Sequence, residues 1–256
     1  MSKLIIMNAE KTILTAENWK DGFVAVDDER HWEPGRSAEQ LSKDFTDGCP
    51  SSGEQSLREM IQFFCDSDNI EWGEAYIEHG SSFDSHPRPR MQDLAIKGTV
   101  NEQSFFIGVE AKVNEPFGSK SVAGQKSYIK RIKANGQKTE ADDRLRDLCK
   151  DFLSNVAEKD YGKIRYQLLY YLAGSFREEG DIIFMPIIVY QSDKYDSSMG
   201  KRNFNAYKNF MELLGFDKVL GHPKGMIESY KKTLCAPDKN RKCMLSKTVY
   251  SCYIEK

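Results

Sequence analysis

The strongest constraint on this chain is a strand-like run in which charged residues stand among apolar ones. Residues 105–113 read FFIGVEAKV, a composition typical of a strand that is buried on both faces. Side chains alternate along a strand with a period of two, so Glu110 and Lys112 are expected on the same face. A buried carboxylate or ammonium is strongly disfavoured unless it is paired or bound to a metal. The run therefore predicts either a structural salt bridge or half of a metal site.

A second acid stands on the preceding strand-like run. Asp93 opens residues 93–96, and the turn-rich residues 97–103 join this run to the charged one. We expect Asp93, Glu110 and Lys112 to meet at one end of two adjacent strands. Two carboxylates offer the hard oxygen ligands that suit Mg²⁺ or Mn²⁺, and a nearby lysine can orient or help to deprotonate a metal-bound water. Phosphodiester hydrolysis needs these parts, which makes the hydrolysis of nucleic acid the natural chemistry.

The remaining pattern predicts an α/β (α+β) fold with a mixed central sheet flanked by helices. Helical spacing of apolar residues indicates helices within 37–45, 54–65, 140–157, 163–178 and 204–214, with Ser37 as the N-cap of the first. Residues 181–190 form an apolar strand that is central by composition, although Pro186 argues for an edge or a bulge. Residues 72–79 fit a helix or a strand, and residues 231–254 indicate β structure.

Composition excludes several classes of protein. The chain has 256 residues, 39% of them apolar and 30% charged, so it can bury one core. No run of eighteen apolar residues occurs, and the N-terminal apolar stretch is too short for a signal peptide, so we expect a cytoplasmic protein with no membrane contact. The six cysteines include no C-x-x-C pair, which predicts reduced thiols rather than disulfides or a zinc ribbon.

Charge is unevenly distributed along the chain. Residues 194–256 hold 13 Lys or Arg against 6 acids, whereas the residues before them hold 24 against 33. A second basic stretch, residues 119–138, fits a helix near the site or a mobile loop, and phosphate contact is expected there. The C-terminal asymmetry is equally consistent with a basic surface that faces a polyanion and with a solvated face.

The arrangement of Asp93 and the run Glu110-Ala111-Lys112, the only acid-x-Lys in the chain, resembles the PD-(D/E)xK nuclease superfamily. In that superfamily an Asp near one strand and an acid-x-Lys on the next form the metal site. The resemblance assigns Asp93 and Glu110 as ligands of Mg²⁺ or Mn²⁺ and Lys112 as the catalytic lysine. It implies a restriction-endonuclease-like fold. The sequence departs from the pattern at Gln92, where the superfamily often has Pro.

A second match lies in IRYQLLYYLAG, where Gln167 and Tyr171 have the Q-x-x-x-Y spacing of RecB-like members. Residues four apart share a face of a helix. In that subgroup such a helix packs beside the metal strands, which assigns Gln167 and Tyr171 to the catalytic site. A core aromatic with an incidental surface amide is the alternative.

The superfamily often adds an upstream helical Glu as a metal ligand. Glu78 is our choice, with Glu74 and Glu59 as rivals.

The segments EAKVNEPFG, IRYQLL and NFMELLGF are also similar to a group of small uncharacterised prokaryotic proteins assigned to this fold. We therefore expect one nuclease-like domain over residues 1–256, with residues 1–35 as a candidate N-terminal extension and residues 194–256 as a basic, β-rich tail. The residues expected to bind nucleic acid are Arg88, Arg90, Lys126, Lys130 and Arg131. For Arg88 and Arg90, two solvated loop arginines beside prolines are the alternative.

The function expected from the resemblance is an Mg²⁺- or Mn²⁺-dependent endonuclease that acts on DNA, as an effector of bacterial antiviral (anti-phage) defence. The alternative is a protein on the same fold that binds nucleic acid or a partner without cutting. A partner subunit or a homodimer fits both interpretations. An unrelated α/β enzyme, with Glu110 and Lys112 as a core ion pair, is the third hypothesis.

Overall fold

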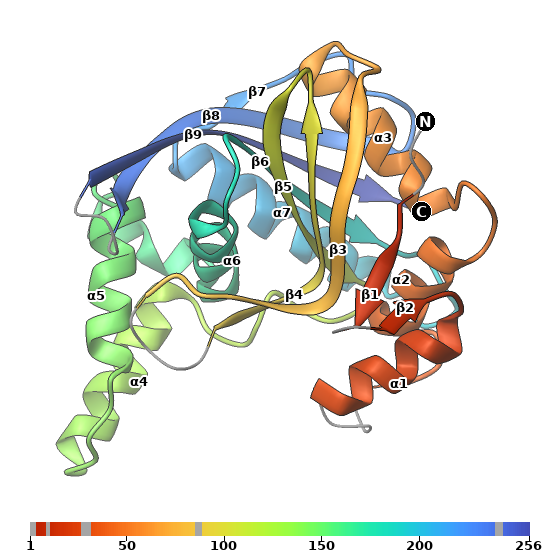
Figure 1. Ribbon diagram of the computed structural model, residues 1–256. Coiled ribbons are helices and arrows are strands. Elements are labelled where there is room, and N and C mark those ends of the chain that lie inside the picture. The colour runs from red at the N-terminus through yellow and green to blue at the C-terminus, as the bar shows by residue number, and fades with distance from the viewer. Residues whose placement is uncertain (1–3, 9–10, 27–31, 85–88, 239–242) are drawn as a thin grey trace.

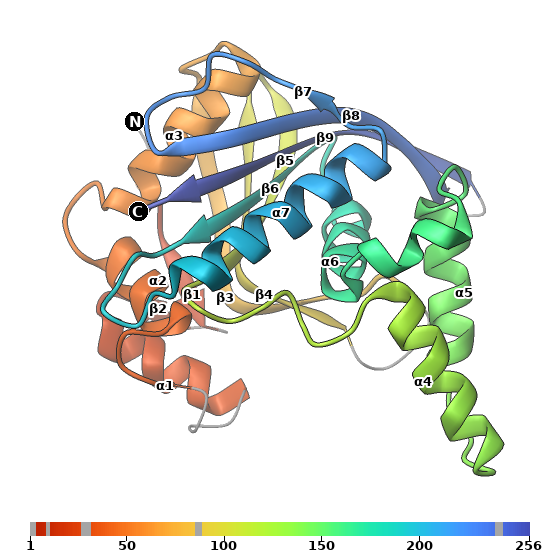
Figure 2. The ribbon, with the colours of Figure 1, turned by 180° about the vertical axis from the view of Figure 1, so that it is seen from behind.

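The computed structural model describes residues 4–8, 11–26, 32–84, 89–238 and 243–256, and it shows a twisted sheet between two layers of helices (Figures 1 and 2). The helices are α1 (Ala16–Val26), α2 (Ser37–Thr46), α3 (Ser52–Cys65), α4 (Val122–Ala134), α5 (Ala141–Phe152), the 3₁₀ helix η2 (Glu158–Lys163), α6 (Tyr166–Arg177) and α7 (Ser197–Leu213). The strands are β1 (Ile6–Asn8), β2 (Lys11–Ile13), β3 (Ile70–Ser81), β4 (Arg90–Val100), β5 (Gln103–Lys112), β6 (Ile182–Val189), β7 (Asp217–Lys218), β8 (Met226–Asp238) and β9 (Cys243–Glu255).

The described strands form one mixed sheet in the order β2-β1-β3-β4-β5-β6-β9-β8-β7. The β3–β4 and β4–β5 pairs are antiparallel, whereas β5–β6 and β6–β9 are parallel. The expected α+β class with a mixed sheet is therefore confirmed. The N-terminal strands form one edge of this sheet and β7 to β9 form the other, so both candidate appendages are continuous with the same sheet.

Each face of the sheet has its own apolar core. Side chains of α1, α2 and α3, including Trp19, Leu41 and Leu57, cover one face. Side chains of α4 to α7, including Leu172 and Tyr207, cover the other face. Burial of β5 on both faces explains its almost continuous apolar sequence, as expected for a central strand. Glu110 and Lys112 lie on the face that is covered by α6.

Several elements differ from the sequence expectations. The turn between β4 and β5 is shorter than residues 97–103, because β4 continues to Val100 and only Asn101 and Glu102 make the turn, both with positive φ. Residues 72–79 belong to strand β3. The N-cap of α2 is Arg36 rather than Ser37. The helix expected over 140–157 ends at Phe152, and η2 precedes α6.

Pro186 lies in the middle of the sheet, so the edge position that proline suggested is wrong. Its strand, β6, runs between β5 and β9. A proline cannot donate to a strand ladder. The Tyr171 hydroxyl from α6 donates to Gly108 O at 2.5 Å and lies 3.1 Å from Pro186 O, bridging β5 and β6 at this point. A side-chain donor therefore supports the sheet where the proline interrupts the backbone pattern.

Candidate active site

The site lies where strands β4 and β5 separate. Their ladder runs from Val100–Gln103 to Leu94–Val109, and the next residue on β4 is Asp93. Its Oδ2 accepts a hydrogen bond from the backbone N–H of Ala111 at 2.7 Å. The Asp93 carboxylate thus takes the place of a strand partner for Ala111. This separation leaves room for long side chains between the strand ends and helix α6.

Glu110 is the centre of the cluster. It is 1% exposed, and three donors reach its carboxylate. Lys112 Nζ and Gln167 Nε2 donate to Oε1, the latter at 2.8 Å, while Arg90 Nη2 donates to Oε2. Burial alone would raise the pKa of Glu110, but the charges of Arg90 and Lys112 outweigh it and hold that pKa below its ordinary value. Glu110 is therefore a buried, fully ionised carboxylate.

The two cations are held in their charged forms by the same contacts. Burial disfavours the charge on Lys112, but the negative charge of Glu110, with a smaller contribution from Asp93, keeps the Lys112 pKa above its ordinary value. The Arg90 pKa is raised for the same reason. Lys112 is therefore an ammonium ion that donates to Glu110. In this state it supplies positive charge and does not act as a base.

Asp93 differs from Glu110 in its charge balance. Burial and the adjacent negative charge of Glu110 raise the Asp93 pKa to about 6, against the lowering effect of Lys112 and Arg90. Repulsion between two neighbouring carboxylates is the condition that a bound cation relieves. Asp93 and Glu110 are thus brought together as the sequence predicted, but most of the available positive charge faces Glu110.

Helix α6 brings both predicted residues to the cluster in different ways: Gln167 reaches the Glu110 carboxylate, and the Tyr171 ring lies 5.8 Å from the Arg90 guanidinium. Gln167 donates to Glu110 and so belongs to the cluster. Tyr171 is 1% exposed and its hydroxyl contacts the backbone carbonyls of Gly108 and Pro186, not a carboxylate. The sequence assigned Tyr171 to the catalytic site, but its phenol hydroxyl bonds to the backbone of the sheet. Tyr171 anchors α6 on the strands that carry the cluster.

The candidates for a third carboxylate ligand lie on β3 and α3. Glu78 has a positive φ of 45° and stands between the β3 residues Ile77 and His79, whose partners on β4 are Leu94 and Gln92. The register therefore places Glu78 across from Asp93. Glu74 is exposed on β3, and Glu59 lies on α3, which covers the opposite face of the sheet. Glu78 is thus nearest Asp93 in the strand register, but it lies on a strand rather than on the helix that the resemblance implied, and it is not grouped with Asp93 and Glu110 as a metal ligand.

The predicted nucleic-acid contacts are dispersed. Arg88 lies outside the described residues. Arg90 is 9% exposed and is directed at Glu110, so it is a component of the cluster rather than a solvated loop arginine. The basic stretch forms α4, which extends away from the sheet beside α5 (Figure 1). There, Lys126 pairs with Glu158 at 2.9 Å, and Lys130 and Arg131 are exposed.

The cluster offers oxygen ligands of the kind that Mg²⁺ and Mn²⁺ prefer, namely the carboxylates of Asp93 and Glu110. The repulsion that raises the Asp93 pKa also favours a cation between them. Arg90 occupies Glu110 Oε2, so a metal that uses this oxygen must displace the guanidinium. Within the described ranges, no three His, Cys, Asp or Glu side chains are grouped to hold a metal. The residues therefore fit a divalent ion in kind, with Arg90 as its competitor.

Sequence reasoning missed several residues around the cluster. Gln92 is fully buried and donates to Ser81 and Ser175 Oγ, and Glu115 accepts from Val113 N while its charge acts on Lys112. Tyr166 and Tyr170 lie one residue before Gln167 and Tyr171 and therefore face a neighbouring side of α6. Their spacing of four residues was a readable signal, because it places two aromatic rings on one helix face.

The fold and the site together define a three-layer α/β protein with a buried carboxylate and cation cluster at the point where two antiparallel strands separate. The model of a domain family of unknown function, DUF6946, matches residues 12–239, so the chain belongs to this family. Neither the curated proteins nor the solved structures gave a match. No helix in the described part of the chain is long and apolar enough to cross a membrane.

Proposed function

We propose that this protein is a metal-dependent nuclease of the PD-(D/E)xK type that hydrolyses phosphodiester bonds, with DNA as the favoured substrate. The observation that carries the proposal is the meeting of Asp93, Glu110 and Lys112 at the ends of adjacent strands, with Gln167 of α6 donating to Glu110. This combination of strand positions and helix contact is the one that the resemblance implies. An ordinary core salt bridge would not require a second carboxylate or a helix amide.

Each side chain has a distinct part in the proposed reaction. Asp93 and Glu110 would hold the divalent ion, and Gln167 fixes the Glu110 carboxylate through its hydrogen bond. Lys112 carries positive charge beside the reacting phosphate, where negative charge grows during an in-line displacement. Arg90, once exchanged from Glu110, adds a second cation whose planar fork matches phosphate oxygens. The ion itself would supply Lewis-acid stabilisation and a more acidic water.

The test is cleavage of plasmid DNA and of a labelled single strand by the purified protein with Mg²⁺ or Mn²⁺, beside Asp93→Asn and Lys112→Ala. Asp93→Asn is nearly isosteric and keeps an oxygen for the Ala111 N–H. The matched control is Asp151→Asn, which changes a buried aspartate paired with Arg177 at 2.8 Å away from the cluster. Loss of cleavage in both site variants but not in the control supports the proposal. Equal cleavage by all four proteins, or none by the wild type, contradicts it.

The specific observation that favours a second function is the engagement of Glu110 by Arg90 as well as Lys112. Two cations on one carboxylate suit a protein that binds nucleic acid or a partner on this fold without cutting. Titration of Mn²⁺ followed by calorimetry separates the two. Heat of binding that disappears in Asp93→Asn favours the nuclease, whereas no metal binding together with salt-sensitive DNA binding favours the non-cleaving protein.

The wider role follows from the proposed chemistry. We place the nuclease in the cytoplasm, as an effector of antiviral defence that acts alone, as a homodimer or with a partner subunit. Contact with nucleic acid is supported by the exposed basic side chains of α4, which would track a nucleic-acid backbone, and by the basic C-terminal quarter of the chain. Cleavage assays with plasmid and with end-labelled linear DNA would distinguish endonuclease from exonuclease activity.

A further inference from the structure

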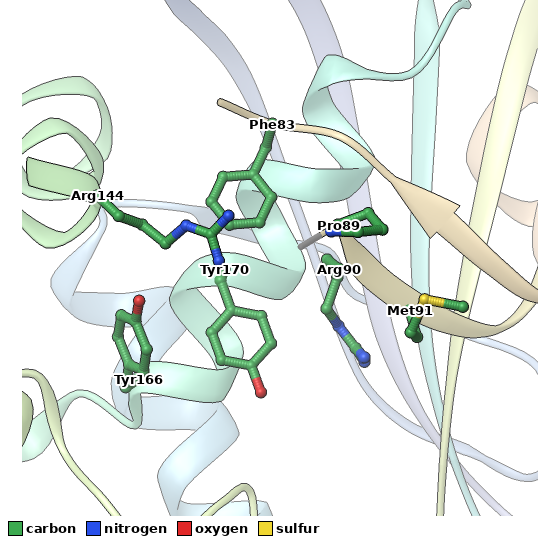
Figure 3. Close-up of a pocket in the computed structure, with 7 residues that line it drawn as sticks. All are labelled: Phe83, Pro89, Arg90, Met91, Arg144, Tyr166 and Tyr170. Carbon is green, nitrogen blue, oxygen red and sulfur yellow. The ribbon is translucent and has the colours of Figure 1, made fainter. Parts of the chain in front are cut away.

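A pocket of about 280 Å³ lies beside the cluster, between α5, α6 and the start of β4 (Figure 3). It is lined by Phe83, Pro89, Arg90, Met91, Arg144, Tyr166 and Tyr170. Ligand pockets in proteins are usually about 300 to 1,000 Å³, so this one is at the small end of the range. Its size suits a single ring system and excludes a large cofactor.

The walls favour a flat and nearly neutral ligand. Both pocket arginines are neutralised by acids. Arg144 makes two hydrogen bonds to Asp84, at 2.6 and 3.0 Å, and Arg90 pairs with Glu110. Five of the seven lining residues are aromatic or apolar. A phosphate would find little unbalanced positive charge here, whereas a planar ring would find faces to stack on.

Aromatic and guanidinium planes are already paired at both ends of the pocket. The Arg90 guanidinium lies 5.5 Å from the centre of the Tyr170 ring, and the Arg144 guanidinium lies 4.9 Å from the centre of the Phe83 ring. Figure 3 shows Arg90 beside Tyr170, and Arg144 reaching Phe83 from the side of α5. Tyr166 and Tyr170 meet edge to face at 5.1 Å. Nucleobases stack on such tyrosine and arginine surfaces.

Arg90, which lines the pocket, also carries an unused hydrogen-bond donor. Arg90 is 9% exposed, and its buried Nε has no hydrogen-bond partner among the described residues, although Nη2 of the same group donates to Glu110. A buried donor without an acceptor is costly. A ligand that presents an acceptor would pair with this donor once the guanidinium turns toward the pocket, and every nucleobase carries a ring nitrogen or a carbonyl oxygen at its edge.

Arg90 connects the pocket to the catalytic cluster, because one guanidinium lines the pocket and contacts Glu110. We propose that the pocket binds one unpaired nucleobase of the substrate strand, next to the phosphate that lies at Asp93 and Glu110. The substrate class is then single-stranded nucleic acid, or a strand with an unpaired or extruded nucleotide, since a base inside a duplex cannot enter a pocket. This inference rests on the proposed nuclease function for the identity of its ligand.

The test measures binding without cleavage. In EDTA at about 150 mM salt, fluorescence anisotropy compares a fluorescein-labelled 12-nucleotide single strand with an abasic strand of the same length and charge and with a duplex. We expect the base-containing strand to bind about 10-fold or more tightly than the abasic strand, the size of one stacking contact. Tyr170→Ala should abolish this difference, while Tyr170→Phe, which keeps the ring, should retain it. Tyr195→Ala, a half-buried tyrosine before α7, is the control and should leave it unchanged.

Equal affinity for base-containing and abasic strands would overturn the inference, as would equal loss in Tyr170→Ala and Tyr170→Phe. The same proteins are then assayed for cleavage with Mn²⁺. Base-dependent binding without cleavage would support the pocket and reject the nuclease. Cleavage without base-dependent binding would reject the pocket and leave the nuclease standing.

Discussion

The raised pKa of Asp93 leads to a quantitative prediction about stability. A carboxyl group whose pKa is higher in the folded chain binds its proton more tightly there than in the unfolded chain. The folded state therefore loses stability as pH rises from about 4 to about 6, because in this range the unfolded chain has released the proton and the folded chain still holds it. The rise from 3.8 to about 6 corresponds to roughly 3 kcal/mol, at about 1.36 kcal/mol for each pKa unit.

The perturbation that isolates this effect is Asp93→Asn, because asparagine has no proton to release and its oxygen can still accept from Ala111 N–H. Urea unfolding in EDTA at pH 4 to 7 gives the free energy of unfolding of both proteins. Contributions from titrating groups away from the cluster are shared and cancel in the difference, whereas Glu110, Arg90 and Lys112 also respond to the loss of the Asp93 charge. We expect the wild type to lose about 2 to 2.5 kcal/mol relative to Asp93→Asn between pH 4 and pH 7, because the unfolded carboxyl is already partly ionised at pH 4. Profiles that stay parallel within about 0.5 kcal/mol would refute the reasoning.

Two further variants test the roles assigned to Glu110 and Tyr171. Glu110→Ala leaves the buried cations Arg90 and Lys112 without their shared partner. The free energy of unfolding, measured by urea titration, should therefore fall by about 3 to 5 kcal/mol. A loss below about 1 kcal/mol would mean that both cations find other partners. Tyr171→Phe removes the hydroxyl that bridges Gly108 and Pro186 and should cost about 1 to 3 kcal/mol without changing the heat of Mn²⁺ binding. An unchanged stability together with altered metal binding would instead place the phenol in the catalytic site.

The predicted cost of Glu110→Ala affects how an inactive variant should be chosen. Stabilities of folded domains are typically about 5 to 15 kcal/mol, so a loss of 3 to 5 kcal/mol can abolish activity through unfolding alone. Glu110 is the centre of a charge network, whereas Asp93 is held by one backbone N–H and already carries an unfavourable interaction with Glu110. Asp93→Asn therefore separates chemistry from stability better than any substitution at Glu110.

The sequence alone predicted those parts of the site that depend on short-range regularities. Strand periodicity correctly placed Glu110 and Lys112 on one face, and helix periodicity predicted a shared face for Gln167 and Tyr171. That this helix packs beside the charged strand was implied by the family resemblance. The mixed sheet with flanking helices followed from the alternation of apolar strands and amphipathic helices. These predictions need only the geometry of one element at a time, which local sequence specifies.

The position of Arg90 depends instead on a break in the regular pattern of β4. Gln92 and Ala95 both pack on the α4–α7 face although they are three residues apart, so the alternation of faces is interrupted at Asp93 and Leu94. Nothing in RPRMQDLAI signals that break, which coincides with the end of the β4–β5 ladder at Leu94 and lies opposite Glu78, a β3 residue with positive φ. After this break the Arg90 side chain points toward Glu110, where it both lines the pocket and contacts the cluster. A residue that the sequence assigned either to phosphate contact or to a solvated loop thereby becomes the link between the proposed base pocket and the proposed metal ligands.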